Sequence, residues 1–283
     1  MFNSPVPMKL IWVFVLAAAM AAQQPASKQH DEKVAGDDRQ GYTDTPQLPN
    51  QPWKVHDAAR PRPHKVTPGL PLPVEKPPAD AIVLFDGKNL DEWVTSNRTE
   101  TTEPKWKINH GVLEIVPHSG RLVTKQKFGD CQLHVEWMIP REATGAGQGR
   151  GNSGIEIMGR YEIQVLESFE NQTYADGQAA SIYGQWPPLV NATRPQGDWN
   201  IYDIFFEAPR FEGEKLVKPA YVTVVHNGIL VHHHQEIIGR AIHRKVATYA
   251  PHAPEESLSL QDHNQPVSYR NIWIRRLKGY DQP

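Results

Sequence analysis

Hydrophobic and polar residues alternate in short segments along the chain after residue 79, and turn-forming residues separate these segments. Residues 132–137 and 161–165 alternate with a period of two, whereas residues 221–225 and 272–274 are rich in β-branched and aromatic side chains. Both patterns are typical of β-strands that turn one or both faces toward a core. We therefore predict strands in these four segments.

A two-residue hairpin is predicted at Asn227 and Gly228, which separate two apolar, β-rich segments. A type I′ turn needs positive φ at both central positions, and Asn-Gly is a pair that adopts it readily. Strands are therefore expected at about residues 221–226 and 229–235.

The chain beyond residue 22 contains no stretch of ten or more residues with the 3.6-residue period of a helix. Many short strands within a region of roughly 200 residues favour two antiparallel sheets packed face to face. The predicted fold class is all-β, a two-sheet β-sandwich, and this domain is expected over residues 79–280.

The first 22 residues have the layout of a secretory signal peptide, with Lys9 before an apolar run over residues 10–22 and small residues at Ala19 and Ala21. The run is shorter than the roughly 20 residues that a membrane-spanning helix needs. We expect a protein that is exported to the periplasm or secreted, with no stable membrane anchor after cleavage. An uncleaved anchor is the alternative.

Residues 23–78 are polar and then rich in proline, with ten prolines between Pro46 and Pro78. Such a segment is expected to bury too little apolar surface to offset the entropy lost on ordering. We predict a disordered or polyproline-II linker, with a proline-motif ligand as the alternative.

Composition excludes several classes of protein. The formal net charge of -2 provides no basic surface for nucleic acid, and a single cysteine, Cys131, rules out an internal disulfide framework and multi-cysteine metal sites. Stability must therefore come from a packed core.

Candidate chemistry gathers around a glycine-rich stretch at residues 149–154 (GRGNSG) and the strand that follows it. On that strand Glu162 and Gln164 share a face, and Glu167 follows, so the face suits a hydroxyl-rich ligand. A solvent-exposed strand face is the plain alternative. Ser153 lacks the strand-to-helix context of a hydrolase nucleophile.

Two histidine-containing segments invite further hypotheses. His232 and His234 would share a face of a regular strand and could bind zinc with a third ligand, although a structural histidine cluster fits the spacing better. Gln261 and His263 also share a face. If their segment pairs with the strand that carries Arg270, a histidine, a carboxylate and an arginine come together as a proton-transfer set or as a salt-bridged cluster.

Several motifs, in order along residues 80–277, resemble those of the 3-keto-disaccharide hydrolase domain family. They are residues 83–93 (VLFDGKNLDEW), 111–113, 151–155 (GNSGI), 161–167 (YEIQVLE), 181–184 (SIYG), 197–200 (GDWN), 227–228 and 270–272. The resemblance implies a concanavalin A-like lectin/glucanase sandwich that acts on glycosides oxidised at C3. It implies an oxidised sugar or glycoside as the ligand and no cofactor, and it leaves metal dependence open.

The implied chemistry is removal of the C2 proton, formation of an enolate and loss of the C1 substituent, with water able to add afterwards. In this hypothesis Glu162 or His263 is the base. The enolate oxygen is stabilised by Arg160, Asn152 or Arg270. The sugar is held by Gln164, Glu167, Tyr183, Trp199 and Gln261. A non-catalytic carbohydrate-binding module and a tethered interaction domain remain alternatives, and a pocket that gathers Glu162, His263 and Arg270 would favour catalysis.

Overall fold

The computed structural model describes residues 1, 39–70, 73–74, 76–97 and 100–279. Apart from Met1, the predicted signal peptide (residues 1–22) and the first part of the predicted linker lie outside these residues, so both stay predictions. The described residues other than Met1 belong to one compact unit. Among them no helix is long and apolar enough to cross a membrane.

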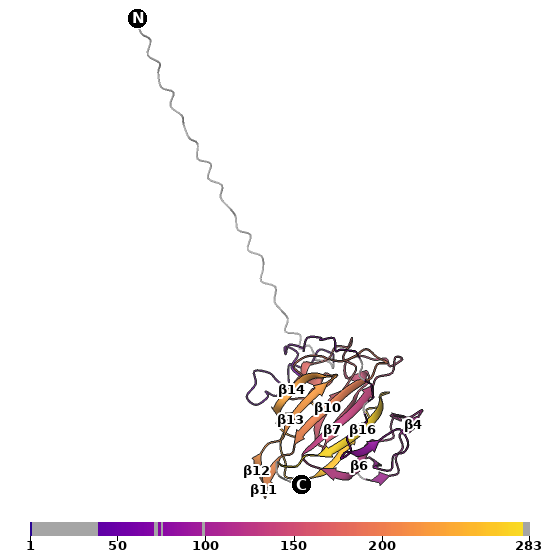
Figure 1. The fold of residues 1–283 in the computed structure, drawn as a ribbon. Helices are drawn as coiled ribbons and strands as arrows, with labels where there is room; N and C mark the ends of the chain where they lie inside the picture. Colours follow the sequence, from indigo (N-terminus) through magenta and orange to yellow (C-terminus); the bar gives the residue numbers. More distant parts are fainter. Residues whose placement is uncertain (2–38, 71–72, 75, 98–99, 280–283) are drawn as a thin grey trace. The chain divides into compact units, whose positions relative to one another are not determined.

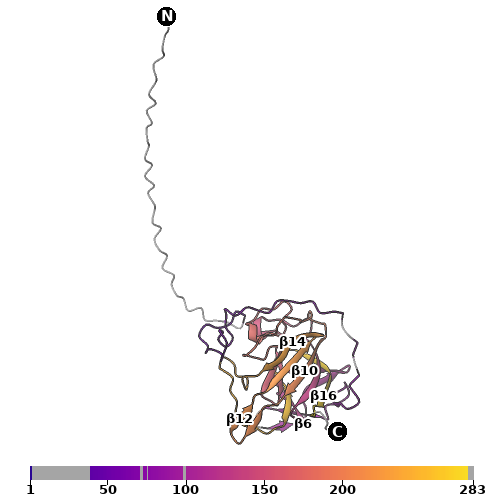
Figure 2. The same ribbon diagram turned by 60° about the vertical axis from the view of Figure 1, so that its left-hand side comes forward.

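Two antiparallel sheets form the body of the protein (Figures 1 and 2). The larger sheet has the order β14-β13-β10-β7-β16-β5-β4, and β1 also pairs with β16. Its strands are β1 (Ile82–Phe85), β4 (Lys107–Asn109), β5 (Val112–Glu114), β7 (Cys131–Met138), β10 (Asn200–Glu207), β13 (Tyr221–His226), β14 (Ile229–Glu236) and β16 (Ser268–Arg276).

The smaller sheet has the order β3-β2-β6-β15-β8-β9. Its strands are β2 (Trp93–Ser96), β3 (Thr101–Thr102), β6 (Arg121–Phe128), β8 (Ser153–Ile157), β9 (Tyr161–Val165) and β15 (Glu256–Leu260). A separate hairpin joins β11 (Arg210–Glu212) to β12 (Lys215–Lys218), and the helical elements of the described chain are two 3₁₀ turns, η1 (Gly147–Gly149) and η2 (Ala175–Gly177). The predicted all-β sandwich is confirmed.

The core lies between the two sheets because the apolar positions of each strand recur with period two. On β9, Tyr161, Ile163 and Val165 join the core cluster, which also contains Trp137 of β7 and Tyr202 of β10. The opposite face of β9 is left for Glu162 and Gln164, as the alternation predicted.

The predicted hairpin is confirmed at Asn227 and Gly228, whose φ angles are 53° and 80°. The turn joins β13 to β14, which pair antiparallel with His226 opposite Ile229. Both central residues therefore have the positive φ that a type I′ turn requires.

The prediction that His232 and His234 share a face is wrong, because the pairing of β13 with β14 shifts register there. His232 is buried and its Nε2 lies 2.8 Å from the Ala180 carbonyl oxygen. His234 has a φ of 43° and an exposed side chain that pairs with Glu207. A bulge turns the two rings into different surroundings.

The linker predicted over residues 23–78 is wrong in its described part. Residues 39–70, here called the N-terminal segment, pack on the sandwich, and Figures 1 and 2 draw them as the indigo stretch across one end of it. Tyr42, Leu48 and Val55 are buried. The main chain also bonds to the sandwich, since Asn191 N donates to His64 O at 2.9 Å.

The sparse apolar residues of the N-terminal segment suffice as anchors because proline lowers the entropy that the chain loses on ordering. Side chains also supply the main-chain partners that a sheet would otherwise provide. Arg60 Nη1 donates to the Gln185 carbonyl at 3.1 Å, and His56 N donates to Asp176 Oδ2 at 3.0 Å. The packed unit therefore begins at or before residue 39, and not at residue 79.

Candidate functional site

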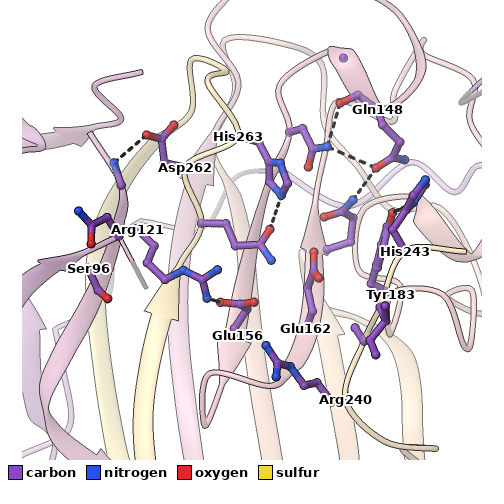
Figure 3. Close-up of a pocket in the computed structure, with 18 of the residues that line it drawn as sticks. Ser96, Arg121, Gln148, Glu156, Glu162, Tyr183, Arg240, His243, Asp262 and His263 are labelled. Atoms are coloured by element: carbon purple, nitrogen blue, oxygen red, sulfur yellow. Dashed lines mark hydrogen bonds and ion pairs between the residues drawn. The ribbon is translucent and has the colours of Figure 1, made fainter. Parts of the chain in front are cut away.

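A cavity of about 960 Å³ lies over the face of the smaller sheet that points away from the core (Figure 3). Its floor is formed by Glu162 and Gln164 of β9, Glu156 of β8 and Arg121 of β6. Loops complete its walls, contributing Gln148, Tyr174, Tyr183, Arg240, His243, Gln261 and His263 among others. Of the four floor residues, the sequence analysis placed Glu162 and Gln164 on this face.

Glu162 is the carboxyl group most removed from water in the cavity, with 7% of its surface exposed. Burial, with a smaller contribution from the charge of Glu156, raises its pKa to about 8, although Gln261 and Arg121 oppose the shift. A carboxyl group with a pKa near neutrality can both take and return a proton.

Gln261 and His263 adjoin Glu162 from the segment after β15. His263 Nε2 lies 2.8 Å from Gln261 Oε1, and the Gln261 side chain also hydrogen-bonds Glu162. Burial lowers the pKa of His263 below its usual value. The ring is therefore neutral near pH 7, and with Nε2–H donating to Gln261 its Nδ1 lone pair is left to accept a proton.

Arg121 and Glu156 form an ion pair beside this group, with Nη1 and Oε2 2.5 Å apart. Ser259 Oγ donates to the same Glu156 oxygen at 2.6 Å. The charge of Arg121 acts on both Glu162 and His263, lowering the pKa of each. Arg121 thus favours the ionised form of Glu162 and the neutral form of His263.

Gly154 allows Glu162 and Gln261 to approach the strand beside them. A Cβ atom on Gly154 would lie 2.6 Å from Glu162 Oε1 and 2.6 Å from Gln261 Oε1. Any larger residue would displace both side chains. This explains the glycine of the Gly-Asn-Ser-Gly motif as a requirement for space.

Amide side chains line the cavity on one side of Glu162. Gln164 Nε2 donates to Gln148 Oε1 at 2.8 Å, and Asn152 Nδ2 donates to Gln148 O at 2.8 Å. The other oxygen-bearing ends, Asn152 Oδ1 and Gln164 Oε1, are buried and accept no hydrogen bond from any described residue. Two buried acceptors with no partner suit the hydroxyl groups of a sugar.

Tyr183 and His243 form the neighbouring wall. Tyr183 OH lies 3.0 Å from His243 Nδ1 and 2.8 Å from Tyr174 OH, and Tyr183 N donates to the Glu162 carbonyl at 3.1 Å. The N-terminal segment supports this wall, because the His56 ring lies 4.0 Å from that of Tyr174. His56 is held in turn by Asp176, with Nδ1 and Oδ1 3.2 Å apart.

The structure brings together only some of the predicted site residues. Those that line the cavity are Glu162, His263, Asn152, Gln164, Tyr183 and Gln261. Arg160 lies outside it, in an adjoining cavity. Glu167 is buried elsewhere, where its Oε1 accepts from Phe169 N at 2.8 Å.

Arg270 and Trp199 are also outside the cavity. The expected pairing of the His263 segment with the Arg270 strand is wrong, because β15 belongs to the smaller sheet and β16 to the larger one. The Arg270 guanidinium lies 4.1 Å from the centroid of the Trp199 ring. Two sheets therefore separate a pair that the sequence suggested as neighbours.

Arg270 belongs instead to a second charged cluster, on β7, β10 and β16 of the larger sheet. Its Nε donates to Glu136 Oε2 at 2.7 Å, and Asn271 Nδ2 donates to Glu136 Oε1 at 2.8 Å. Burial alone would raise the pKa of Glu136, but hydrogen bonds from His134, Asn271 and Arg270 lower it. Burial likewise opposes the charge on His134, yet Asp203 and Glu136 raise its pKa to about 9.

Sequence reasoning missed Glu156, Arg121, Arg240 and His243. Glu156 lies two residues after Gly154 on the same face of β8, so the alternation of that strand could have revealed it. Arg121 and Arg240 come from segments that are distant in sequence, and no spacing rule connects them to β9. As for metals, no group of three or more His, Cys, Asp or Glu side chains in the described chain is placed to hold an ion.

Comparison with known proteins finds relatives of the greater part of this chain. The chain matches the sequence model of the 3-keto-alpha-glucoside-1,2-lyase-like domain over residues 80–275. It is 25% identical over 166 residues to a 3-keto-disaccharide hydrolase of Bacteroides thetaiotaomicron, a match that covers 46% of this chain and 53% of that relative. The matched part thus spans about half of the relative's length.

Solved structures show the same fold. A Parabacteroides distasonis protein provisionally called a glycosyl hydrolase is 42% identical, with a TM-score of 0.69 over 77% of this chain and 93% of that chain. A second protein from that organism, with the same provisional description, is 19% identical and has a TM-score of 0.51 over 70% of this chain and 94% of its own. The second likeness concerns the fold alone.

Proposed function

The chain belongs to the 3-keto-alpha-glucoside-1,2-lyase-like domain family, and from that premise we propose that it is a glycoside-processing enzyme that cleaves 3-keto-glycosides. The relative named as a 3-keto-disaccharide hydrolase supports this substrate class. The observation that carries the proposal is Glu162, a buried carboxyl group whose pKa is raised to about 8 on the floor of a polar cavity.

The proposed reaction is an elimination across C1 and C2 of the oxidised sugar. The C3 ketone acidifies the C2 hydrogen, so a base can remove that proton and leave an enolate. Collapse of the enolate forms the C1–C2 double bond and breaks the C1–O bond, whose electrons leave with the glycosidic oxygen and take up a proton. Addition of water, with hydrogen to C2 and hydroxide to C1, completes a net hydrolysis.

Glu162 is assigned as the base. Its carboxylate form lies in a site with little water, which makes it more basic than an exposed glutamate, and proton transfer by a positioned group contributes roughly 10²- to 10⁴-fold to rate. Gln261 holds the side chain from one side, and Gly154 leaves room for it on the other. The Glu162 carboxyl group then carries the proton that the leaving group or C2 receives.

Arg121 is assigned as the group that stabilises the enolate oxygen, in place of Arg160 and Arg270. It lines the same cavity as Glu162 and its charge acts on that carboxyl group. A fixed cation in a desolvated site stabilises the developing oxyanion more strongly than it would in water. The unpartnered oxygens of Asn152 and Gln164 are assigned to the sugar hydroxyls.

The test is incubation of the purified protein with a 3-keto-glucoside in D₂O, with NMR detection of deuterium at C2 and of free aglycone. Exchange and release together support the proposal. Sugar binding by a folded sample without either signal would replace it with the alternative, a carbohydrate-binding module.

The pH profile of kcat/KM separates the two candidate bases. With Glu162 as the base the rate rises with pH up to about 8, since the carboxylate form increases over that range. With His263 as the base the rise ends below the usual histidine pKa, because burial lowers the pKa of that ring. A rise that persists to pH 8 in His263→Ala and is lost in Glu162→Gln assigns the proton transfer to Glu162.

A further inference from the structure

A second cavity, of about 450 Å³, adjoins the first. Ser96, Arg121 and Arg240 line both cavities, so the two form one cleft along the smaller sheet. Figure 3 shows Arg240 on the side of Glu162 away from Gln148, and Arg240 also lines the second cavity. The cleft therefore has room for a group beyond the one bound beside the amides.

The floor of the cleft changes in character along β9. Gln164 and Glu162 lie on one face of β9, and Arg160 is the turn residue directly before the strand begins at Tyr161. Gln164 and Glu162 line the first cavity, and Arg160 lines the second. The cleft thus has amide side chains at one end and arginine side chains at the other, and the candidate base Glu162 lies between them.

Arg160 and Arg240 come from segments that touch, because Ala241 N donates to Arg160 O at 3.3 Å. Neither guanidinium forms an ion pair or side-chain hydrogen bond with any residue in the described part of the chain. The Nε atom of Arg160 is buried and also lacks a hydrogen-bond partner. Arg160 is half-buried and Arg240 is exposed, and both line the second cavity, so an anion bound there would meet two cations that no carboxylate of the described chain neutralises.

The other charged groups of the second cavity are already compensated. Arg121 pairs with Glu156, and Lys127 Nζ lies 3.1 Å from Glu256 Oε2. The carboxylates near the cavity are therefore held by other cations, and the charges of Arg160 and Arg240 stay available for a ligand.

From this cleft we infer that the protein prefers substrates that carry an anionic oxyacid group, a carboxylate or a sulfate, on the part that leaves from C1. The inference rests on the proposed function and names its substrate class. The sugar ring lies against the amides and Glu162, and the leaving part extends past Glu162 to Arg160 and Arg240. The planar guanidinium groups of arginine suit such anions because they can donate two parallel hydrogen bonds.

The test compares three α-glucosides whose phenyl leaving group carries a 4-carboxylate, a 4-sulfate or a neutral 4-carboxamide. Binding of the unoxidised compounds to the full chain is measured by calorimetry, and turnover of their 3-keto forms by phenol release. We expect at least one anionic compound to bind roughly tenfold more tightly than the carboxamide. We expect the 3-keto form of that compound to have a higher kcat/KM than the carboxamide, through a lower KM at similar kcat. Comparison of the carboxylate with the sulfate shows which oxyacid group is favoured.

The double variant Arg160→Gln/Arg240→Gln is expected to reduce that preference to less than about twofold. The matched control Lys107→Gln/Lys215→Gln removes the same charge from β4 and β12 and should retain the preference. Equal binding of all three compounds, or a preference that survives in the arginine variant, overturns the inference. A preference in binding without turnover of any 3-keto compound keeps the anion site and removes the proposed function.

Discussion

The two faces of the sandwich that point away from the core carry the same residue types with opposite electrostatics. On the larger sheet Glu136 accepts hydrogen bonds from Arg270 and Asn271, its pKa is lowered, and the neighbouring His134 has a pKa raised to about 9. On the smaller sheet the pKa of Glu162 is raised to about 8 and that of His263 is lowered. One cluster is charged at neutral pH and the other is neutral.

The two clusters contain similar residue types, but they differ in how many partners compensate the charge of the buried glutamate. Glu136 meets an arginine, an amide and a histidine, so its ionised form is stabilised despite burial. Glu162 is also buried, yet Arg121, the arginine whose charge acts on it, is already paired with Glu156. A glutamate with full partners holds strands together, whereas one left short of partners can exchange a proton.

The largest expected effect is on turnover. Glu162→Gln should reduce kcat for release of aglycone from a 3-keto-glucoside about 10³-fold, because the amide cannot accept the C2 proton. Glu136→Gln serves as the counterpart and should leave kcat within about threefold, since it does not line the cavity. Comparable losses in both variants would contradict the division between the two clusters.

The next effect is on stability. Glu136→Gln should lower the free energy of unfolding by about 3 kcal/mol at pH 7, because it removes the buried counter-charge of Arg270 and leaves His134 with Asp203 alone. The pKa of Glu136 is lowered on folding, so its contribution exists above the unfolded pKa and is lost as pH falls through the folded one. Urea titrations of parent and variant should therefore converge at acid pH, and a gap that persists at pH 3 would count against an electrostatic cause.

A smaller effect is expected from Gly154→Ala, which changes no titratable group. The added methyl would press on Glu162 and Gln261, and misplacement of the base should lower kcat about 30-fold with little change in melting temperature. Gly69→Ala is the matched control, since a Cβ there meets no atom within 4 Å. Unaltered kcat in Gly154→Ala would show that Glu162 tolerates displacement.

The last predicted effect is a gain in the free energy of unfolding. The pKa of Glu162 is raised on folding, so ionisation of this group weakens the folded state as pH rises from the unfolded value of about 4.3 to about 8. Glu162→Gln should therefore be more stable than the parent at pH 9 and nearly equal to it at pH 4.5, as measured by urea titration at the two pH values. A variant that is less stable than the parent at pH 9 would indicate that ionised Glu162 has partners.

Local patterns in the sequence predicted the features that depend on neighbours in the chain. Alternation placed Glu162 and Gln164 on one face of β9, and it placed Gln261 beside His263. The turn at Asn227 and Gly228 followed from backbone sterics alone. These inferences needed no knowledge of which strand pairs with which.

Pairing between distant strands was not predictable in the same way. The assignment of β15 and β16 to different sheets depends on contacts that span the whole domain, and it removed Arg270 from the site. Arg121 reaches the cavity from β6 and Arg240 from a loop, so no spacing in the sequence joins them to Glu162. The proline content also led to the wrong prediction of a linker over residues 39–70. It indicates a stiff backbone but does not reveal that Tyr42 and Val55 are buried against the sandwich.

Because of the N-terminal segment, the region shared with the family and the region that packs as one unit begin at different residues. The family match begins at residue 80, whereas His56, which lies against the cavity wall, is 24 residues earlier in the chain. A gene fragment trimmed to the shared region would encode both sheets except for the last residue of β16 and still leave the buried Asp176 without the His56 imidazole. Recombination that moves this domain into another protein must therefore include the N-terminal segment, or supply a substitute for it.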